Sequence, residues 1–592
     1  MDNPHQRIVR DILPLVRNPA QYIGREVNQI RKNHKAVDLT FALAFPDTYA
    51  IGMSHLGLQV LYHMLNSRPD LACERVFAPA LDMAAELRWH SIPLLTLESA
   101  TNVAHFDVLG FTLQHEMTYT NILYMLDLAR IPLLTRNRNT RHPLVIAGGP
   151  GAMAPEPLAD FIDLFYVGEA EKALPQLIDR IIELKHLNNR HDMLRQLATS
   201  VPSVYVPSLY EVEYDGPKQV SFRPRYDDIP ETIDYAVVDD LENAPCPTAP
   251  VVPVTETIHD RIAIEIMRGC PHGCRFCQAG MTRKPVRTRS VDRLLKLAEA
   301  AYRNTGHDEI SLLSLSSNDY PDLDQLLRKF HRKFTPLQVN LSVPSLHVSP
   351  NLVAIPEVLA AVRKSGLTFA PEAAYTELRR IIGKNVSNDD LFAGIAAAYQ
   401  AGWNLVKLYF MVGLPGEIDS DRQAIADLSL RVSQLRRQAL SKGAGNVNTA
   451  VAWFVPKPHT PFQWEPMADR DLLRQTRMDL SRRLRRTKVR VRFHNIARSC
   501  LEAAIARGDR RVGAVIRIAY DMGAVFDDWD EHFCEDYWIE AFSQAHLDPL
   551  DFSHRRRNDD EILPWNHVRT FRTTDYLAHQ RDQARQLIAV RS

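Results

Sequence analysis

The sequence predicts an α/β protein with two parallel-sheet units in tandem. Short apolar runs alternate with longer segments of helical apolar spacing over residues 36–200, and the alternation resumes over residues 256–490. Apolar runs that alternate with helices are typical of strands in a parallel sheet that is covered on both faces. The length of 592 residues also exceeds that of one ordinary domain.

Composition excludes several classes of protein. The chain is 45% hydrophobic and 24% charged, which is typical of globular rather than disordered or fibrous proteins. Because 71 Lys and Arg balance 71 Asp and Glu, binding of nucleic acid through overall charge is not favoured. The sequence has no run of 18 apolar residues, so it predicts no membrane helix. The first residues are too polar for a signal peptide. We therefore expect a cytoplasmic protein with no membrane partner.

The N-terminal unit begins with an expected helical arm at residues 1–35. The strands of the first sheet are predicted at 36–45, 105–113, 143–149 and 163–169, with helices at 56–67 and 121–131. An open doubly wound sheet binds ligands at the carboxyl ends of its strands. The turns that follow these strands, at 46–54, 147–152 and 167–171, are polar or rich in glycine.

The second unit follows a Pro-rich linker at residues 201–255, which carries a few strands. Six strands are predicted in residues 256–490, with helices between them, and this pattern suggests a full or partial (β/α) barrel. They lie at 262–269, 309–317, 338–346, 367–373, 404–413 and 447–456. Residues 491–592 are expected to form a mainly helical cap.

Three of the seven cysteines, Cys270, Cys274 and Cys277, lie together directly after the first of these six strands. Three thiolates with C-x3-C-x2-C spacing can converge on a soft metal centre. A structural zinc site usually has four ligands in paired C-x2-C form, and the chain has no second pair. The loop suits an iron–sulfur cluster with one open iron; zinc and incidental buried thiols are the alternatives. Cys500 and Cys534 are interpreted as core thiols.

This loop resembles that of the radical S-adenosylmethionine (SAM) enzymes, including the phenylalanine, Phe276, before the last cysteine. The resemblance implies a partial (β/α)6 TIM barrel in which the three cysteines hold a [4Fe-4S] cluster. SAM would bind the fourth iron. One electron, from a donor such as flavodoxin or ferredoxin, would then release a 5′-deoxyadenosyl radical that removes a hydrogen atom from a substrate not yet identified.

Other residues match the SAM-binding segments of that superfamily at the ends of successive strands. The resemblance implies cofactor contacts from Phe276 and from strand-end residues of the predicted barrel. These are Ser314 and Ser316 after the second strand, Ser345 after the third, Glu372 after the fourth and Gly413 after the fifth. For any one of them, a helix cap or a turn is an equally good interpretation.

The N-terminal unit resembles the Rossmann-like (flavodoxin-like) cobalamin-binding domain that precedes some radical SAM barrels. Asp47, Tyr49 and Gly52 match its D-x-H-x-x-G frame, with tyrosine in place of the histidine that ligates cobalt. The departure is compatible with base-off cobalamin without a protein ligand, and His55 and His115 are nearby alternative ligands. The resemblance also implies corrinoid contacts at two later turns. Their residues are Gly148, Gly149, Gly168 and Glu169.

The activity that the resemblance implies is cobalamin-dependent methyl transfer to an unactivated carbon. One alternative is a radical SAM enzyme that modifies RNA and has a degenerate cobalamin domain, because the segment Arg482–Arg492 is strongly basic. The preferred interpretation of that segment is a solvated helix and strand that join the barrel to the cap. Methylthiolation would require three more cysteines near the N-terminus, where only Cys73 and Cys246 occur. A non-catalytic redox or cobalamin sensor is the third alternative.

Overall fold

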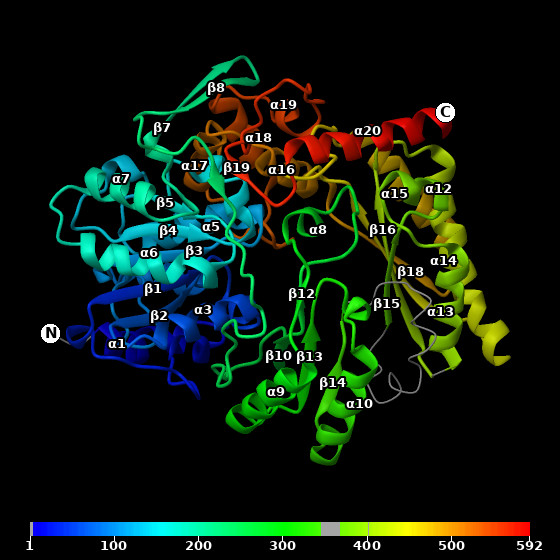
Figure 1. Cartoon of the computed structure of the whole chain (residues 1–592), viewed down its shortest axis with the longest axis horizontal. Coiled ribbons are helices and arrows are strands. Elements are labelled where there is room, and N and C mark those ends of the chain that lie inside the picture. The colour runs from blue at the N-terminus through cyan, green and yellow to red at the C-terminus, as the bar shows by residue number, and fades with distance from the viewer. Residues whose placement is uncertain (1–3, 345–366, 401, 592) are drawn as a thin grey trace.

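The N-terminal unit is built on a six-stranded sheet with the order β2-β1-β3-β4-β5-β6, in which only β6 is antiparallel to its neighbour (Figure 1). The computed structural model describes residues 4–344, 367–400 and 402–591. The strands are β1 (Leu39–Phe45), β2 (Leu71–Phe77), β3 (Val108–Thr112), β4 (Leu144–Gly148), β5 (Leu164–Tyr166) and β6 (Val204–Tyr205). The predicted α/β class is confirmed for this unit.

Helices separate these strands and bury the apolar residues of the sheet. They are α2 (Tyr49–Met53), α3 (Leu56–Asn66), α4 (Leu81–Trp89), α5 (Tyr119–Leu128), α6 (Ala170–Leu184) and α7 (Arg190–Ser200). After β2 is added on one side of β1, the chain crosses to the other side and adds β3, β4 and β5 there. Ligands of doubly wound sheets bind at this switch point, between β1 and β3.

Strand β2 was not predicted, because two charged residues interrupt its apolar pattern. Both are buried: Arg75 lies between Glu26 and Glu98, with nitrogen–oxygen distances of 2.5 and 2.7 Å. Glu74 accepts hydrogen bonds from Thr96 and Ser99. Ion pairing makes the burial of these charges tolerable, and those partners lie too far along the sequence for a local pattern to reveal them.

The N-terminal arm is a series of short turns rather than one long helix. It starts with α1 (Pro4–Arg7), followed by single turns up to Ala36. Ile8 and Ile12 nevertheless pack, as their spacing suggests, against Met83 and Leu87 of α4.

The linker completes the first sheet through β6 and then forms a hairpin of β7 (Tyr210–Asp215) and β8 (Lys218–Pro224). Farther on, β9 (Ile233–Asp234) pairs with β19 (Val568–Arg569) near the C-terminus.

The second unit has two sheets of parallel strands. One contains β10 (Ile262–Glu265), β13 (Glu309–Leu313) and β14 (Asn340–Ser342). The other contains β15 (Leu367–Glu372), β16 (Leu405–Val412), β17 (Asn446–Trp453) and β18 (Val489–Phe493). Each of the six predicted strands coincides with an observed one. The chain between the two sheets, residues 345–366, lies outside the described residues, so their closure into a partial barrel stays a prediction.

Helices cover the outer faces of these sheets (Figure 1). They are α9 (Val291–Thr305), α10 (Leu323–Phe334), α12 (Thr376–Ile381), α13 (Asn388–Gln400), α14 (Asp419–Leu440) and α15 (Arg470–Leu484). The basic segment Arg482–Arg492 is the end of α15 and most of β18, so its interpretation as a helix and strand is confirmed.

The C-terminal region is mainly helical, as expected. Its helices are α16 (Ile496–Ala506), α17 (Val512–Asp521), α18 (Glu535–Gln544), α19 (Pro549–Ser553) and α20 (Thr574–Arg591). It packs on both units: α17 contacts α5, whereas α20 contacts α12. Among the described residues, no helix is long and apolar enough to cross a membrane.

A candidate cofactor site between the two units

The cysteine loop is held between a short antiparallel pair of strands and two helices. It follows β11 (Met267–Arg268), which pairs with β12 (Arg287–Thr288), and leads into α8 (Gln278–Thr282). The Arg275 guanidinium donates to the carbonyls of Arg380 and Ile381 at 2.9 and 2.7 Å, which fixes the loop on the end of α12. The Cys277 sulfur caps α8 by accepting from the Gly280 N–H at 3.3 Å.

The three sulfurs are spaced for something larger than one ion. Two thiolates on a tetrahedral zinc lie about 3.8 Å apart, given a Zn–S bond near 2.3 Å. Within the described part of the chain, the cysteines are not among the sets of three ligand atoms that lie within 4.8 Å of one another. Their soft donors and wide spacing therefore fit a multinuclear iron–sulfur cluster better than a single zinc ion.

Two lysines give this loop a positive surrounding. Burial raises the pKa of the Cys274 thiol to about 12, and the charge of Lys384 opposes that rise. Lys284 donates to the Cys270 carbonyl. Burial also raises the pKa of Cys270 and of Cys277. Since metals bind thiolates, these cations favour the form of the loop that can hold a cluster.

Two of the predicted SAM-binding residues lie at the cysteine loop. Glu372, at φ +66°, ends β15 and is half-buried, with Oε1 3.2 Å from the Lys384 ammonium. Ser316 donates to Asp319 at 2.5 Å, and Asp319 is 2.7 Å from Nε2 of His272 within the loop. Their contact with SAM stays a prediction.

The other predicted SAM-binding residues are not joined to the loop in this way. Ser314 bonds to Ser317 at 2.9 Å, and the Gly413 N–H donates to Glu417 at 2.8 Å. Phe276 packs with Ile381 and Leu414 in a small apolar cluster, as a shielding side chain would. Ser345 lies outside the described residues.

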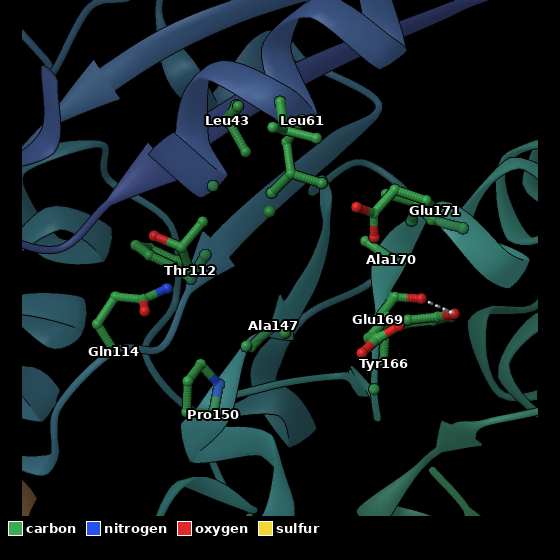
Figure 2. A pocket seen from close by; sticks show the side chains of 18 of the residues that line it. Leu43, Leu61, Thr112, Gln114, Ala147, Pro150, Tyr166, Glu169, Ala170 and Glu171 are labelled. Carbon is green, nitrogen blue, oxygen red and sulfur yellow. Dashed lines mark hydrogen bonds between the residues drawn. The ribbon is translucent and has the colours of Figure 1, made fainter. Parts of the chain in front are cut away.

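A cavity of about 310 Å³ opens at the carboxyl ends of the first sheet, at the switch point between β1 and β3. Figure 2 shows Leu43, Leu61, Thr112 and Ala147 around it. Its apolar walls also include Phe41, Leu65 and Ile146, and Glu265, Arg268 and Arg283 of the second unit line it as well. The cavity thus lies between the two units, within the size range of small-molecule sites.

The predicted glycine turns lie on this cavity. Gly148, Gly149, Gly168 and Glu169 all line it. Gly149 has φ +102°, and a Cβ there would lie 2.8 Å from the Leu113 carbonyl oxygen. Gly168 has φ +119°, and its Cβ would lie 2.3 Å from the Ala236 nitrogen. Only glycine allows these two turns to pass so close to neighbouring backbone.

The residues of the D-x-H-x-x-G frame do not line the cavity. The Tyr49 hydroxyl points to the N-terminal arm, where it donates to Glu26 at 2.7 Å. Asp47 accepts from Trp529 at 3.2 Å, and Gly52 lies against Phe77. Their predicted contact with a corrinoid is therefore not supported by the geometry, and the spacing alone could not reveal where Tyr49 points.

His55 lines the cavity instead. Burial lowers the pKa of its imidazole to about 4, so the ring is neutral at pH 7. It caps α3, with Nδ1 accepting from the Leu58 N–H at 3.3 Å.

His115 belongs to a separate cluster where three parts of the chain meet. The Lys457 ammonium is 2.9 Å from Glu116 and 2.8 Å from Glu502, and His115 is 3.6 Å from Glu502. The ligand atoms of His115, Glu116 and Glu502 are close enough to share a metal ion. Lys457 already supplies the positive charge between the two carboxylates, so we interpret the group as an ion-pair cluster.

Sequence reasoning missed the groups that join the cavity to the cysteine loop. Glu169 receives two hydrogen bonds from Arg287, at 2.7 and 2.9 Å. Glu171 is 2.8 Å from Arg268, two residues before Cys270. The G-E-x-E spelling of the turn was visible, but its arginine partners lie about a hundred residues later in the chain.

Comparison with known proteins identifies both units. Residues 57–207 match the family model described as radical SAM proteins, N-terminal, and residues 264–429 match that of the radical SAM superfamily. The two ranges make up more than half of the chain.

Two curated relatives were found. An uncharacterized protein of Methanocaldococcus jannaschii is 27% identical over 478 residues, covering 80% of this chain and 89% of that protein. The ribosomal protein uS12 methylthiotransferase RimO of Acaryochloris marina is 24% identical over 183 residues. That match covers 28% of this chain and 39% of RimO.

Solved structures show lower similarity. The methyltransferase TsrM from Kitasatospora setae, with cobalamin and a [4Fe-4S] cluster bound, has a TM-score of 0.45 at 13% identity, covering 70% of this chain and 74% of TsrM. The cobalamin-dependent enzyme OxsB, with aqua-cobalamin and SAM bound, has a TM-score of 0.49 at 12% identity, covering 86% of this chain and 71% of OxsB.

The family matches confirm the resemblance that rests on the C-x3-C-x2-C loop, and with it a [4Fe-4S] cluster and SAM as cofactors. The chain belongs to the radical SAM superfamily.

Proposed function

We propose that the protein is a cobalamin-dependent radical SAM methyltransferase that acts on an unactivated carbon. The observation that carries the proposal is the cavity at the switch point of the first sheet, whose wall includes Arg268, two residues from Cys270. A cobalamin-sized ligand anchored there would extend toward the cysteine loop. When bound, the cluster and SAM supply a carbon radical, and cobalamin supplies the methyl group.

The residues of this chain would bind and orient those groups. Cys270, Cys274 and Cys277 would hold the cluster, with Phe276 covering it from the apolar side. The backbone of Gly148 and Gly149 would lie against the corrinoid, because neither residue has a side chain to keep it away. The apolar walls formed by Phe41 and Leu61 would enclose its aromatic base.

The geometry supports cobalamin without a tyrosine ligand, because Tyr49 points away from the cavity. The carboxylates of Glu169 and Glu171 are neutralised by Arg287 and Arg268. The side of the cavity that faces the second unit therefore presents ion pairs to a ligand rather than unpaired carboxylates. Such a wall would orient amide and phosphate groups without repelling them.

Methylthiolation, the activity in the name of the RimO relative, is less well supported. The resemblance requires three further cysteines for a second cluster, and before the loop the sequence has only Cys73 and Cys246. Cys73 lies within β2 and is 1% exposed.

Anaerobic reconstitution tests the proposal. We expect the reduced protein to give a [4Fe-4S] EPR signal that SAM perturbs, and to produce 5′-deoxyadenosine. Cys270→Ala should abolish both, whereas Cys534→Ala, a half-buried cysteine far from the loop in sequence, should retain both. Production of 5′-deoxyadenosine by the wild type would also exclude a purely sensory role.

Cobalamin binding is tested separately by titrating hydroxocobalamin and following its visible spectrum. A saturable spectral change that Gly149→Ala weakens would support the methyltransferase proposal. No binding by the reconstituted wild type would refute that part and leave the radical SAM assignment in place.

A further inference from the structure

The β15–β18 sheet has one apolar face and one polar face. On β16, Leu408, Phe410 and Val412 are buried against the outer helices. Because side chains alternate along a strand, Lys407 and Tyr409 point to the opposite face. That face turns away from α13 and α14 (Figure 1).

Cations from neighbouring strands stand in register on this polar face. Lys407 is paired with Asn448, and Asn448 with Arg490. One step along the strands, Tyr409 is paired with Ala450, and Ala450 with Arg492. We call these six residues the basic face.

The two rows have the same shape, because each places a short side chain between two long ones. Adjacent strands lie about 4.8 Å apart, so Lys407 and Arg490 are separated by about 10 Å across Asn448. Arg490 and Arg492 are about 6.6 Å apart along β18. The short side chains of Asn448 and Ala450 therefore lie between Lys407 and Tyr409 on one strand and Arg490 and Arg492 on the other.

The cations of the basic face have no partners within the described residues. Neither Lys407, Arg490 nor Arg492 forms an ion pair there. By contrast, Arg422, Arg470 and Arg483 of the same unit each pair with a carboxylate. Arg490 and Arg492 are exposed, and Tyr409 is 43% exposed. An unpaired set of three cations beside an exposed aromatic ring indicates a ligand that is both anionic and aromatic.

The direction of β18 relates this face to the cysteine loop. Lys488 precedes the strand, and Arg490 and Arg492 follow toward its carboxyl end. The carboxyl ends of parallel strands lie at the same edge of the sheet, and β15 ends there at Glu372. Glu372 pairs with Lys384, whose charge opposes the rise in the pKa of Cys274. The cations thus lead along the sheet toward the candidate active site.

We propose that the basic face binds a single-stranded nucleic acid and presents one of its nucleotides to the radical site. Phosphates would contact Lys407, Arg490 and Arg492, and a base would stack on Tyr409. Proteins that bind single strands without sequence preference combine cations for the backbone with aromatic rings for the bases in this way. The zero net charge of the chain is compatible with this, because the cations are gathered on one face. This substrate class rests on the proposed radical SAM function.

Fluorescence anisotropy with 5′-labelled single-stranded oligonucleotides tests the binding without SAM or turnover. RNA and DNA strands of one mixed sequence would be compared, and the better ligand identifies the source. We expect Arg490→Ala combined with Arg492→Ala to weaken binding at least tenfold. Loss of two phosphate contacts should also reduce the slope of log K against log salt by about 1.4.

A matched double variant controls for the charge change. Arg437 and Arg477 are exposed on α14 and α15, on the outer side of the same sheet, so replacing both with alanine removes two charges elsewhere. That control should bind as the wild type does. Equal weakening by both double variants, or no binding of either strand by the wild type at physiological salt, would overturn the proposal.

Tyr409 separates a nucleic acid from a simple polyanion. Tyr409→Leu should weaken binding of the oligonucleotide severalfold, whereas the affinity for inorganic polyphosphate, measured by competition, should not change. If polyphosphate competes as well as the oligonucleotide and Tyr409→Leu has no effect, the face recognises phosphate alone and the proposal fails. Release of 5′-deoxyadenosine is measured independently, so failure of RNA or DNA binding and failure of the radical chemistry remain distinguishable.

Discussion

Glu169 and Arg287 join the two α/β units through a bidentate ion pair, with oxygen–nitrogen distances of 2.7 and 2.9 Å. The side chains are 2% and 7% exposed. Glu169 also accepts from the Val238 N–H at 2.8 Å, so one carboxylate holds the first sheet, the linker and the base of the cysteine loop together.

Glu169→Gln should destabilise the protein by about 3 kcal/mol, because it leaves the buried Arg287 charge without its counter-ion. Urea denaturation of the purified protein measures this. Glu183→Gln breaks an ion pair with Arg180 in which Glu183 is 61% exposed, and should change stability by less than about 1 kcal/mol. Equal effects of the two substitutions would show that the Glu169 pair does not join the units.

Gly149→Ala should weaken cobalamin binding and lower stability by about 1–3 kcal/mol. The residue has φ +102°, and the new Cβ would lie 2.8 Å from the Leu113 carbonyl oxygen, so the turn must move away from the cavity. Gly443→Ala is the matched control, since nothing lies within 4 Å of its Cβ position. Thermal unfolding and hydroxocobalamin titration measure the two effects. Unchanged binding by Gly149→Ala would indicate that this turn does not touch the corrinoid.

The sequence was sufficient to predict the elements whose signal is local. A local run of apolar residues is enough to predict β1, β3, β4 and the six strands of the second unit. The cysteine loop is predicted from its C-x3-C-x2-C spacing alone. By contrast, β2 could not be predicted, because the charge of its buried Arg75 is neutralised by Glu26 and Glu98 from other segments. The same reason concealed the direction of Tyr49, whose partner Glu26 lies in the N-terminal arm.

The cavity and its link to the cysteine loop could not be predicted, because they are assembled from distant segments. Glu169 and Arg287 are 118 positions apart, yet their side chains lie 2.7 Å apart. Likewise, the basic segment was visible, but only strand pairing shows that Arg490 and Arg492 share a face with Lys407.

Glu502→Gln should destabilise the protein most between about pH 4.5 and 6.5. Burial would raise the pKa of Glu502, but Lys457 and His115 outweigh it and hold the pKa well below 4.5. Its stabilisation is therefore complete above pH 4.5 and is lost only as the pH falls through the lowered value. Burial would lower the pKa of His115, but Glu502 and Glu116 raise it above 6.5. That contribution is complete below pH 6.5 and is lost as the pH rises through the raised value.

Urea denaturation at about pH 5.5 and about pH 8.5 measures the difference between wild type and Glu502→Gln. We expect about 3 kcal/mol at the lower pH and a smaller loss at the higher one. Glu540→Gln, on the exposed side of α18, should differ from wild type by less than about 0.5 kcal/mol at both. A loss that grows with pH would contradict the assignment of His115 to this cluster.

His55→Asn should preserve both the fold and cobalamin binding, whereas His55→Ala should cost about 1 kcal/mol. The His55 ring caps α3 by accepting from the Leu58 N–H, and asparagine is an equally good cap, but alanine has no acceptor. If His55 instead ligated cobalt, the wild-type cob(II)alamin EPR spectrum would carry nitrogen superhyperfine splitting that both substitutions remove. Nδ1 accepts from the Leu58 N–H, so the neutral His55 ring carries its proton on Nε2 and has no free lone pair for cobalt. Because Tyr49 also points elsewhere, we expect identical spectra without that splitting for all three proteins. Nitrogen splitting confined to the wild type would reassign His55 from a helix cap to an axial ligand.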